Sequence, residues 1–329
     1  MTGSSAARRL VLRRVVAAFG LAHAGPSMAE ADAPASGGAA AAACHPAARQ
    51  ALQRRTLVAA YYELKLALVA GRVIEWTDAR APREVVRDAV QVAVSASHGF
   101  AVDAQARLLA WRAGATQIDV LLDSVVWVAA GDSGILAIRC DGSLWHGRIG
   151  GAWKREADDA VHAWVGDGAD YHVRANGALY VRGLAHRGQY GDGTLRESPD
   201  WTQVASDAVA VVAHTGHALY LRRDGAVLGT GGNRFGPLGR HGFGDKADRW
   251  GVIFTDAVSL ATGSRHSLAI RGDGSVWIWG DAAGLQPRRV LEHATAAAGG
   301  MHDSVVLMRD ASVSVFAPGK PTARLALPR

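Results

Sequence analysis

The chain of 329 residues carries 39 glycines and 10 tryptophans, a composition typical of β-rich folds with many tight turns. Its formal net charge of +6 is concentrated at the N-terminus, where residues 1–56 hold seven arginines and two acidic residues. A nucleic-acid-binding domain carries its basic patch on the folded body. The charge balance therefore argues against DNA or RNA as a partner.

The first 50 residues are expected to lie outside the folded domain. Arginines between residues 8 and 14 precede the short apolar stretch VVAAFGLAHAG, which is the order of an export signal. Residues 1–29 are therefore predicted to be that signal, which would place the protein in the periplasm or outside the cell without a remaining membrane span. The alternative is a disordered or mis-started N-terminus. Residues 30–50, rich in alanine, are predicted to form a flexible tether.

The two cysteines are Cys44 and Cys140. In an exported protein they can form one disulfide that ties the tether to the domain. Cys44 as a lipidated cysteine is the other possibility. The chain has no C-x-x-C pair, which disfavours zinc.

One hairpin pattern recurs along the rest of the chain. SHGFAVDAQARLLAW (97–111) aligns without a gap to RHSLAIRGDGSVWIW (265–279), and an upstream DAVxV marker recurs in step. Seven copies are found, with turn positions at Gly71, Ala106, Gly142, Gly177, Gly225, Gly274 and Ala311.

The repeat predicts the fold class. Each unit of about 35 residues has room for four short strands, and a single such sheet cannot bury both of its faces. Residues 51–329 are therefore predicted to be one all-β domain, a seven-bladed β-propeller of four-stranded blades. Because residues 321–327 resemble the strand that leads into a new repeat, they are expected to pair in the sheet of repeat one and close the ring.

Two longer segments carry a family resemblance. GLAHRGQYGDGT (183–194) and GGNRFGPLG (231–239) are similar to the WGxNxxGQLGxGxT segment of the regulator of chromosome condensation repeat family. AIRGDGSVWIWG resembles the hallmark hairpin of that family. The resemblance implies a seven-bladed propeller. Family members include a nucleotide-exchange factor for a small GTPase and a secreted bacterial inhibitor of β-lactamases, but no inhibitory residue can be transferred by motif.

Catalytic and metal-binding signals are absent from the sequence. His98, His217, His266 and His302 share one repeat position, so they are expected to be spread round the ring. We expect them to tie neighbouring backbone segments together, since metal ligands must converge on one ion. No nucleophile elbow, zinc-protease helix or phosphate loop is found. The protein is therefore predicted to be no enzyme and to hold no cofactor or metal.

The candidate binding residues come from the two units that are longer than the rest. The extra segments of repeats four and five, 184–201 and 232–250, are rich in the Arg and aromatic residues that interfaces favour. The candidate partner-binding residues are Arg187, Tyr190, Arg234, Phe235, Arg240, Phe243 and Arg249. The alternative is that these segments are scaffold, with Trp201 and Trp250 as packing residues.

The predicted function is that of an exported, monomeric protein-interaction module with a protein partner. A binder of peptidoglycan or another cell-envelope carbohydrate is the alternative hypothesis. A secreted enzyme inhibitor and a catalytic propeller with polar groups in its channel remain further alternatives.

Overall fold

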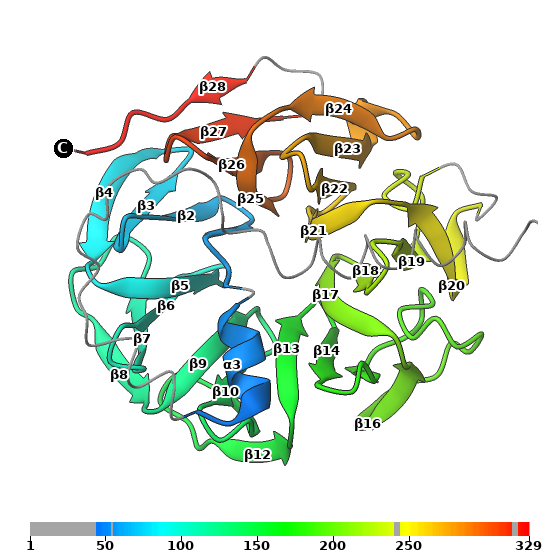
Figure 1. Ribbon diagram of the computed structural model, residues 1–329, viewed down its shortest axis with the longest axis horizontal. Helices are drawn as coiled ribbons and strands as arrows, with labels where there is room; N and C mark the ends of the chain where they lie inside the picture. The colour runs from blue at the N-terminus through cyan, green and yellow to red at the C-terminus, as the bar shows by residue number, and fades with distance from the viewer. Residues whose placement is uncertain (1–43, 54, 240–243, 318–321, 329) are drawn as a thin grey trace, which may run out of the picture.

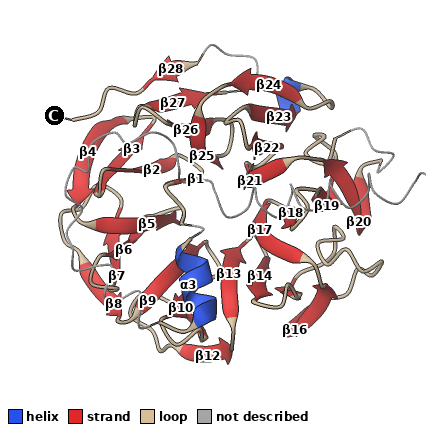
Figure 2. Cartoon of the chain, viewed as in Figure 1, coloured by secondary structure: helices blue, strands red, loops and turns tan. Residues whose placement is uncertain are grey.

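A computed structural model of the chain describes residues 44–53, 55–239, 244–317 and 322–328 (Figure 1). Seven four-stranded antiparallel sheets stand side by side in a ring, and they confirm the predicted seven-bladed β-propeller. Figure 2 shows that strands make up nearly all of the regular structure. The predicted export signal, residues 1–29, lies outside the described residues.

Each blade is built from four strands that follow one another in the chain. Blades 1 and 2 contain β1 (Val58–Tyr61), β2 (Leu64–Val69), β3 (Arg72–Thr77), β4 (Arg80–Val86), β5 (Ala89–Val94), β6 (His98–Asp103), β7 (Leu108–Arg112) and β8 (Asp119–Leu122). Blades 3 and 4 contain β9 (Val125–Ala130), β10 (Ile135–Arg139), β11 (Leu144–Gly147), β12 (Lys154–Ala157), β13 (Ala160–Val165), β14 (Ala169–Arg174), β15 (Leu179–Gly183) and β16 (Ser198–Ala205).

The remaining three blades repeat this order. Blades 5 and 6 contain β17 (Ala208–His214), β18 (His217–Arg222), β19 (Val227–Gly232), β20 (Lys246–Phe254), β21 (Ala257–Thr262), β22 (His266–Arg271), β23 (Val276–Gly280), the 3-10 helix η1 (Asp281–Ala283) and β24 (Arg288–Leu291). Blade 7 contains β25 (Ala294–Gly299), β26 (Ser304–Met308), β27 (Val313–Phe316) and β28 (Ala323–Arg324).

The best-preserved hairpin shows why the sequence forms these strands. Gly274 has φ +87°, a left-handed conformation that glycine adopts without strain, and it ends the turn between β22 and β23. Val276 and Ile278 are fully buried on one face of β23. Trp279 is fully buried on the other face, so this strand packs against a neighbouring blade on each side.

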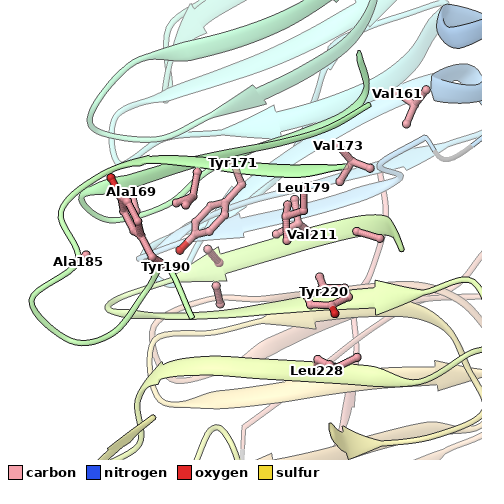
Figure 3. Packing of buried hydrophobic residues seen from close by; sticks show 14 of the residues in the cluster. Val161, Ala169, Tyr171, Val173, Leu179, Ala185, Tyr190, Val211, Tyr220 and Leu228 are labelled. Carbon is pink, nitrogen blue, oxygen red and sulfur yellow. The ribbon is translucent and has the colours of Figure 1, made fainter. Parts of the chain in front are cut away.

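The hydrophobic core lies between the blades. One cluster joins blades 4 and 5, where Tyr171 and Val181 of one blade pack with Val211 and Tyr220 of the next (Figure 3). Tyr190, from the long segment of repeat four, lies in the same cluster. Because each blade supplies apolar side chains to both of its neighbours, a blade is stable only within the ring.

The predicted closure by terminal strand pairing is wrong. Residues 323–324 form β28, which pairs with β27 at Val315 and Ala323 and is therefore the outer strand of blade 7 itself. Every repeat already supplies its own fourth strand, so the first blade has no edge that needs a strand from the C-terminal segment. The segment still reaches blade 1, because Arg72 Nη2 donates a hydrogen bond to Pro328 O at 2.9 Å.

Side chains join blade 7 to blade 1 instead. Val58 and Ile74 of blade 1 pack with Val305 of blade 7. Lys65, only 1% exposed, lies 2.6 Å from Asp78 Oδ1 and 3.0 Å from Asp303 Oδ2. Burial by itself would lower the pKa of Lys65, but its bonds to the two carboxylates raise the pKa above its ordinary value.

Part of the predicted tether is folded. Residues 46–52 form the helix α3 (Pro46–Leu52), which begins after His45 and has proline in its first turn. Ala48 and Ala51 are buried against the inner strands of blades 3 and 4 (Figure 1). The prediction of a flexible tether over residues 30–50 is therefore wrong at its C-terminal end, because the alanines of α3 bury apolar surface there.

A disulfide between Cys44 and Cys140 ties α3 to the β10–β11 turn. The sequence had left this pairing open beside a lipidated Cys44. His45 N also donates to Cys140 O at 2.8 Å, so the entrance to the helix is held by a covalent and a hydrogen bond. No helix within the described ranges is long and apolar enough to cross a membrane.

Candidate functional site

The two long segments lie on one side of the ring. Because neighbouring strands are antiparallel, the connections from first to second and from third to fourth strand open on the same side of every blade. We call this side the insertion face, since it carries the longest third-to-fourth connections, residues 184–197 and 233–245. The hairpin turns and α3 lie on the opposite side.

The blade 4 connection is wedged against blade 5. Gly188 O accepts a hydrogen bond of 2.8 Å from Thr230 Oγ1 of β19, and Gly193 N donates to Asp248 O of β20. Tyr190 is fully buried, and its hydroxyl lies 3.0 Å from Gly183 O. Tyr190 was predicted to contact a partner, but the structure places it in the core between the blades.

The blade 5 connection packs on blade 6 in the same way. Pro237 O accepts hydrogen bonds from Trp279 Nε1 at 2.7 Å and from Ser267 Oγ at 2.8 Å. Leu238 is fully buried in the core between blades 5 and 6. The buried middle of each long segment is therefore scaffold, as one of the two interpretations from sequence held.

The ends of the two long connections and two residues of blade 6 form a surface cluster that we call the arginine patch: Arg187, Arg234, Phe235, Arg265 and Leu285. Arg265 is half-buried and the other four residues are exposed. The Phe235 side chain is 42% exposed. The guanidinium carbon of Arg265 lies 4.3 Å from the centre of its ring, and that of Arg234 lies 5.9 Å away. Such cation–π contacts hold an exposed ring in place.

The patch is continuous across blades 4, 5 and 6. Arg187 lies beside Gly232, where an added Cβ would come 3.5 Å from its Cδ atom. The side chain of Leu285, which is 40% exposed, likewise lies where a Cβ on Gly236 would point. Phe235 O accepts a hydrogen bond of 2.6 Å from Asp281 N, which anchors the backbone of the patch to blade 6.

The seven predicted binding residues are thus distributed unevenly. Arg187, Arg234 and Phe235 come together in the arginine patch. Arg249 is exposed on β20, with its guanidinium against Gly193 of the blade 4 connection. Arg240 and Phe243 lie outside the described residues.

Two members of the patch were missed from sequence. Arg265 belongs to a first-to-second strand connection and Leu285 to the short third-to-fourth connection of blade 6. Neither residue lies in the two long segments. A comparison of connections that open on the same face would have found both residues.

The mouth of the central channel on the insertion face is spanned by side chains. Tyr61 of blade 1 stacks on His214 of blade 5, with ring centres 5.2 Å apart, and its hydroxyl donates to Asp132 Oδ2 of blade 3 at 3.3 Å. Burial raises the pKa of Tyr61 and lowers the pKa of His214 to about 4. The neutral His214 ring, the Tyr61 hydroxyl and the Asp132 carboxylate therefore join three blades at the axis.

The repeat-encoded histidines join neighbouring blades, in part as predicted. His266 Nε2 lies 2.8 Å from Ser304 Oγ of blade 7, and His217 Nε2 lies 3.4 Å from Ser267 Oγ of blade 6. The partners are serine side chains, not the backbone groups that were expected. His98 bonds Ser97 of its own blade, and His302 is exposed. No group of three metal-ligating side chains occurs among the described residues.

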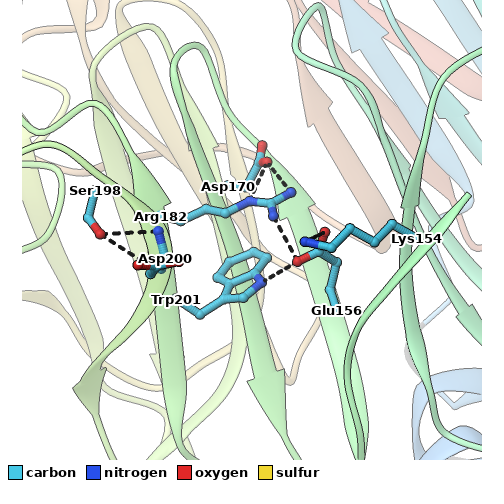
Figure 4. A network of polar contacts seen from close by, with 7 residues as sticks. All are labelled: Lys154, Glu156, Asp170, Arg182, Ser198, Asp200 and Trp201. Carbon is cyan, nitrogen blue, oxygen red and sulfur yellow. Dashed lines mark hydrogen bonds and ion pairs between the residues drawn. The ribbon is translucent and has the colours of Figure 1, made fainter.

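A charged network fills the crevice between blades 3 and 4 (Figure 4). Arg182 lies 3.0 Å from Glu156 Oε2 and 3.2 Å from Asp170 Oδ2. Its guanidinium stacks on Trp201, whose indole N–H donates to Glu156. Burial raises the pKa of Asp170, although the Arg182 charge opposes this shift. The network is a structural contact between blades, and Trp201 is a packing residue as one interpretation held.

Seven closed blades with polar contacts at the axis define a β-propeller built from internal repeats. Residues 257–282, from β21 to η1, match the family described as Regulator of chromosome condensation (RCC1) repeat. The match lies in the sixth repeat, which contains the hairpin AIRGDGSVWIWG, and the described chain as a whole has the fold of a seven-bladed β-propeller. No curated protein matches the whole sequence.

Solved structures resemble the fold at low sequence identity. Prp20p from Saccharomyces cerevisiae is 17% identical with a TM-score of 0.64, over 76% of this chain and 81% of that chain. Human WBSCR16 is 13% identical with a TM-score of 0.66, over 77% and 87%. Yeast RCC1 (Prp20) bound to Kap60 is 14% identical with a TM-score of 0.66, over 90% and 85%. These likenesses concern the fold alone.

Proposed function

We propose that this protein is a non-catalytic, exported interaction module that binds a protein partner through the arginine patch. The observation that carries the proposal is Phe235, a large aromatic side chain that is 42% exposed and held by Arg265 on the insertion face. Aromatic and arginine side chains dominate the energetics of protein interfaces.

The rigidity of the patch supports this function. Leu238, three residues after Phe235, is buried, and Pro237 O is hydrogen-bonded to blade 6. The contact residues therefore sit on a backbone that is already ordered, so binding costs little conformational entropy. The patch holds three arginines, and we expect the complementary surface of the partner to be acidic.

The relatives support a protein as the partner. Prp20p is described with its binding properties to Gsp1p and histones, and yeast RCC1 (Prp20) was solved bound to Kap60. Propellers of this shape thus bind other proteins. The partner of the present chain is a separate question, because the identities are 17% and 14%.

The disulfide supports export. Disulfides persist in oxidising compartments such as the periplasm and are rare in the cytosol, and Cys44–Cys140 lies directly after the alanine-rich segment. Fractionation of cells that produce the full chain, with mass analysis of the mature N-terminus, tests this point. Full-length protein recovered from the cytosol with free thiols would contradict export.

The carbohydrate alternative has less support. Sugar binding would need several exposed aromatic faces, but Tyr190 is buried and Trp201 and Trp250 pack against other side chains. Sedimentation of the protein with purified cell wall distinguishes the two hypotheses. Loss of sedimentation on Phe235→Ala would favour a carbohydrate site at the patch over a protein partner.

Site-specific photo-crosslinking tests the protein-binding proposal. A benzophenone amino acid replaces Phe235 in cells that produce the full chain, and we expect one discrete crosslinked protein that mass spectrometry can identify. The matched control carries the same group at Val252, which is 48% exposed on β20 of the same blade. The Arg234→Glu variant should reduce the yield at least tenfold, since it repels an acidic surface.

Two outcomes would reject the patch as the binding site. The same crosslinked protein at equal yield from positions 235 and 252 would indicate non-specific capture. A yield that is unchanged by Arg234→Glu would show that the arginines make no contribution.

A further inference from the structure

Two crevices between blades are filled by the same short turn. Residues 188–191 (GQYG) and 236–239 (GPLG) share the pattern G-x-Φ-G, where Φ is a large apolar residue. Matching backbone hydrogen bonds close them: Gly191 N donates to Gly188 O, and Gly239 N donates to Gly236 O. In each turn the Φ side chain, Tyr190 or Leu238, is fully buried between two blades.

The position of the buried side chain relative to the third strand is defined. Leu238 lies over Gly229 of β19, where an added Cβ would come 2.8 Å from Leu238 Cδ2. Gly229 pairs with Leu219, and in blade 2 the equivalent residue, Ala110, pairs with Phe100. In blade 4 the equivalent residue is Val181, which lies in one core cluster with Tyr190, so a side chain at this position is compatible with a Φ residue beside it. The space beside Ala110 is therefore the place where a Φ side chain would lie between blades 2 and 3.

That space is open in the structure. A cavity of about 260 Å³ lies there, lined by Ala110, Ala115, Gln117, Asp119 and Ile149 among others. Its volume equals that of roughly eight waters at about 30 Å³ each, enough for the side chain of a leucine or a tyrosine. The third-to-fourth connection of blade 2, residues 113–118 (AGATQI), is short and has no G-x-Φ-G turn.

The opening has a mixed rim. Ile149, 41% exposed, is its large apolar member, and His98, Arg112, Gln117 and Asp119 are polar. The neighbouring crevices are filled differently, because Glu75 bonds Trp111 between blades 1 and 2 and the Arg182 network lies between blades 3 and 4. Between blades 2 and 3, Trp153 packs against the apolar core and lies over Gly147, so the pocket beside Ala110 is the part of this crevice that stays open.

We propose that this crevice binds a G-x-Leu-G or G-x-Tyr-G turn of a partner protein. The turn of the partner would place a large apolar side chain in the crevice, as residues 188–191 and 236–239 do in two other crevices of this chain. Blade 3 has Gly147 where blade 6 has Trp279, and the ring of Trp153 covers that glycine. Gln117 and Arg112 at the rim of blade 2 are the donors for the carbonyl groups of the turn. The site is separate from the arginine patch.

A peptide from the chain itself is the probe. Ac-NRFGPLG-NH2, residues 233–239, carries its own turn-forming groups, since Gly236 N donates to Asn233 O and Leu238 N to Asn233 Oδ1. Titration of the full-length protein, followed by NMR, should shift the amide signals of Ala110, Ala115 and Ile149 with a Kd of about 1 mM. The control peptide Ac-NRFGPAG-NH2 should bind at least tenfold more weakly.

Two variants keep the test decisive. Ala110→Phe fills the pocket from its floor and should abolish the shifts. Ile149→Asp changes only an exposed rim residue, so it should fold normally and still weaken binding at least fivefold. Equal binding of both peptides, equal binding to Ile149→Asp, or shifts that map to blades 4 to 6 would each overturn the proposal. An Ala110→Phe protein that fails to fold leaves the decision to Ile149→Asp and the control peptide.

Discussion

One strand position shows how single residues join the blades. The third-strand residue that pairs with the second residue of the second strand donates a hydrogen bond to the preceding blade in four cases: Trp111 to Glu75, Arg182 to Glu156, Thr230 to Gly188 and Trp279 to Pro237. Indole, guanidinium and hydroxyl groups all perform this role. The common feature is a buried donor that faces the neighbouring blade, so the residue type varies while the contact is kept.

The buried histidines predict a pH dependence of stability. Burial lowers the pKa of His217 to about 3 and that of His266 to about 4, whereas an unfolded histidine has a pKa of about 6.5. The unfolded state therefore takes up more protons below pH 6.5, and stability present above that pH is lost as the pH falls towards 4. At pH 5 the cost is about 2 kcal/mol for each histidine.

Urea unfolding at pH 7.5 and pH 5.0 measures this loss. The free energy of unfolding should differ less between the two pH values in His266→Gln than in the wild type, by about 2 kcal/mol. His302→Gln, at an exposed position of blade 7, should leave this difference unchanged. An unaltered pH dependence in His266→Gln would contradict the assignment.

At the scale of the element, the long connections act as wedges between blades. Each long connection places one Φ side chain in the core and leaves its flanking residues at the surface. Leu238→Ala should therefore lower the free energy of unfolding by about 2–5 kcal/mol, because it opens a cavity between blades 5 and 6. Leu285→Ala, at a 40% exposed position, should change it by less than about 0.5 kcal/mol. Similar urea midpoints for both variants would contradict the wedge.

The helix α3 is held to blade 3 by a disulfide that closes a long segment of chain. Cys44 and Cys140 are 96 residues apart, and a loop of that length restricts the unfolded state by up to about 4.7 kcal/mol. A reducing agent should therefore lower the melting temperature of the protein. The Cys44→Ser/Cys140→Ser variant should melt at the temperature of the reduced protein and be insensitive to the agent. A wild-type melting curve that is insensitive to complete reduction would reject a stabilising role.

At the scale of the whole molecule, the ring is closed without a strand shared between its ends. Blades 7 and 1 meet through an apolar cluster and through Lys65, whose ammonium group is buried between Asp78 and Asp303. The covalent chain joins every other pair of neighbouring blades, so this interface depends on non-covalent contacts. A buried charge that loses its partner is strongly destabilising.

Lys65→Met tests the closure. Removal of the ammonium group leaves Asp303 without its partner, and we expect a loss of about 3–5 kcal/mol in the free energy of unfolding. The double variant Lys65→Met/Asp303→Asn should recover part of that loss, because no charge is then left buried. A double variant that is less stable than Lys65→Met would show that the ion pair does not account for the effect.

Prediction from sequence succeeded where the signal is local. The hairpin around Gly274 and the DAVxV markers lie within one repeat, and they defined the number of blades and their order. Tyr190 was misplaced because its side chain is buried by strands of blade 5, which no local pattern reveals. Residues 46–50 were misplaced because their apolar surface is covered only when blades 3 and 4 are already formed.

The sequence by itself determined a ring of seven hairpin-built blades, since strand, turn and return strand are encoded within about 35 residues. The tertiary structure decided which side chains reach the surface, how the ring closes and which crevice stays open. The physical reason is that these properties depend on contacts between blades. Phe235 and Tyr190 look alike as aromatic residues of long segments, and only the packing of the neighbouring blade exposes one and buries the other.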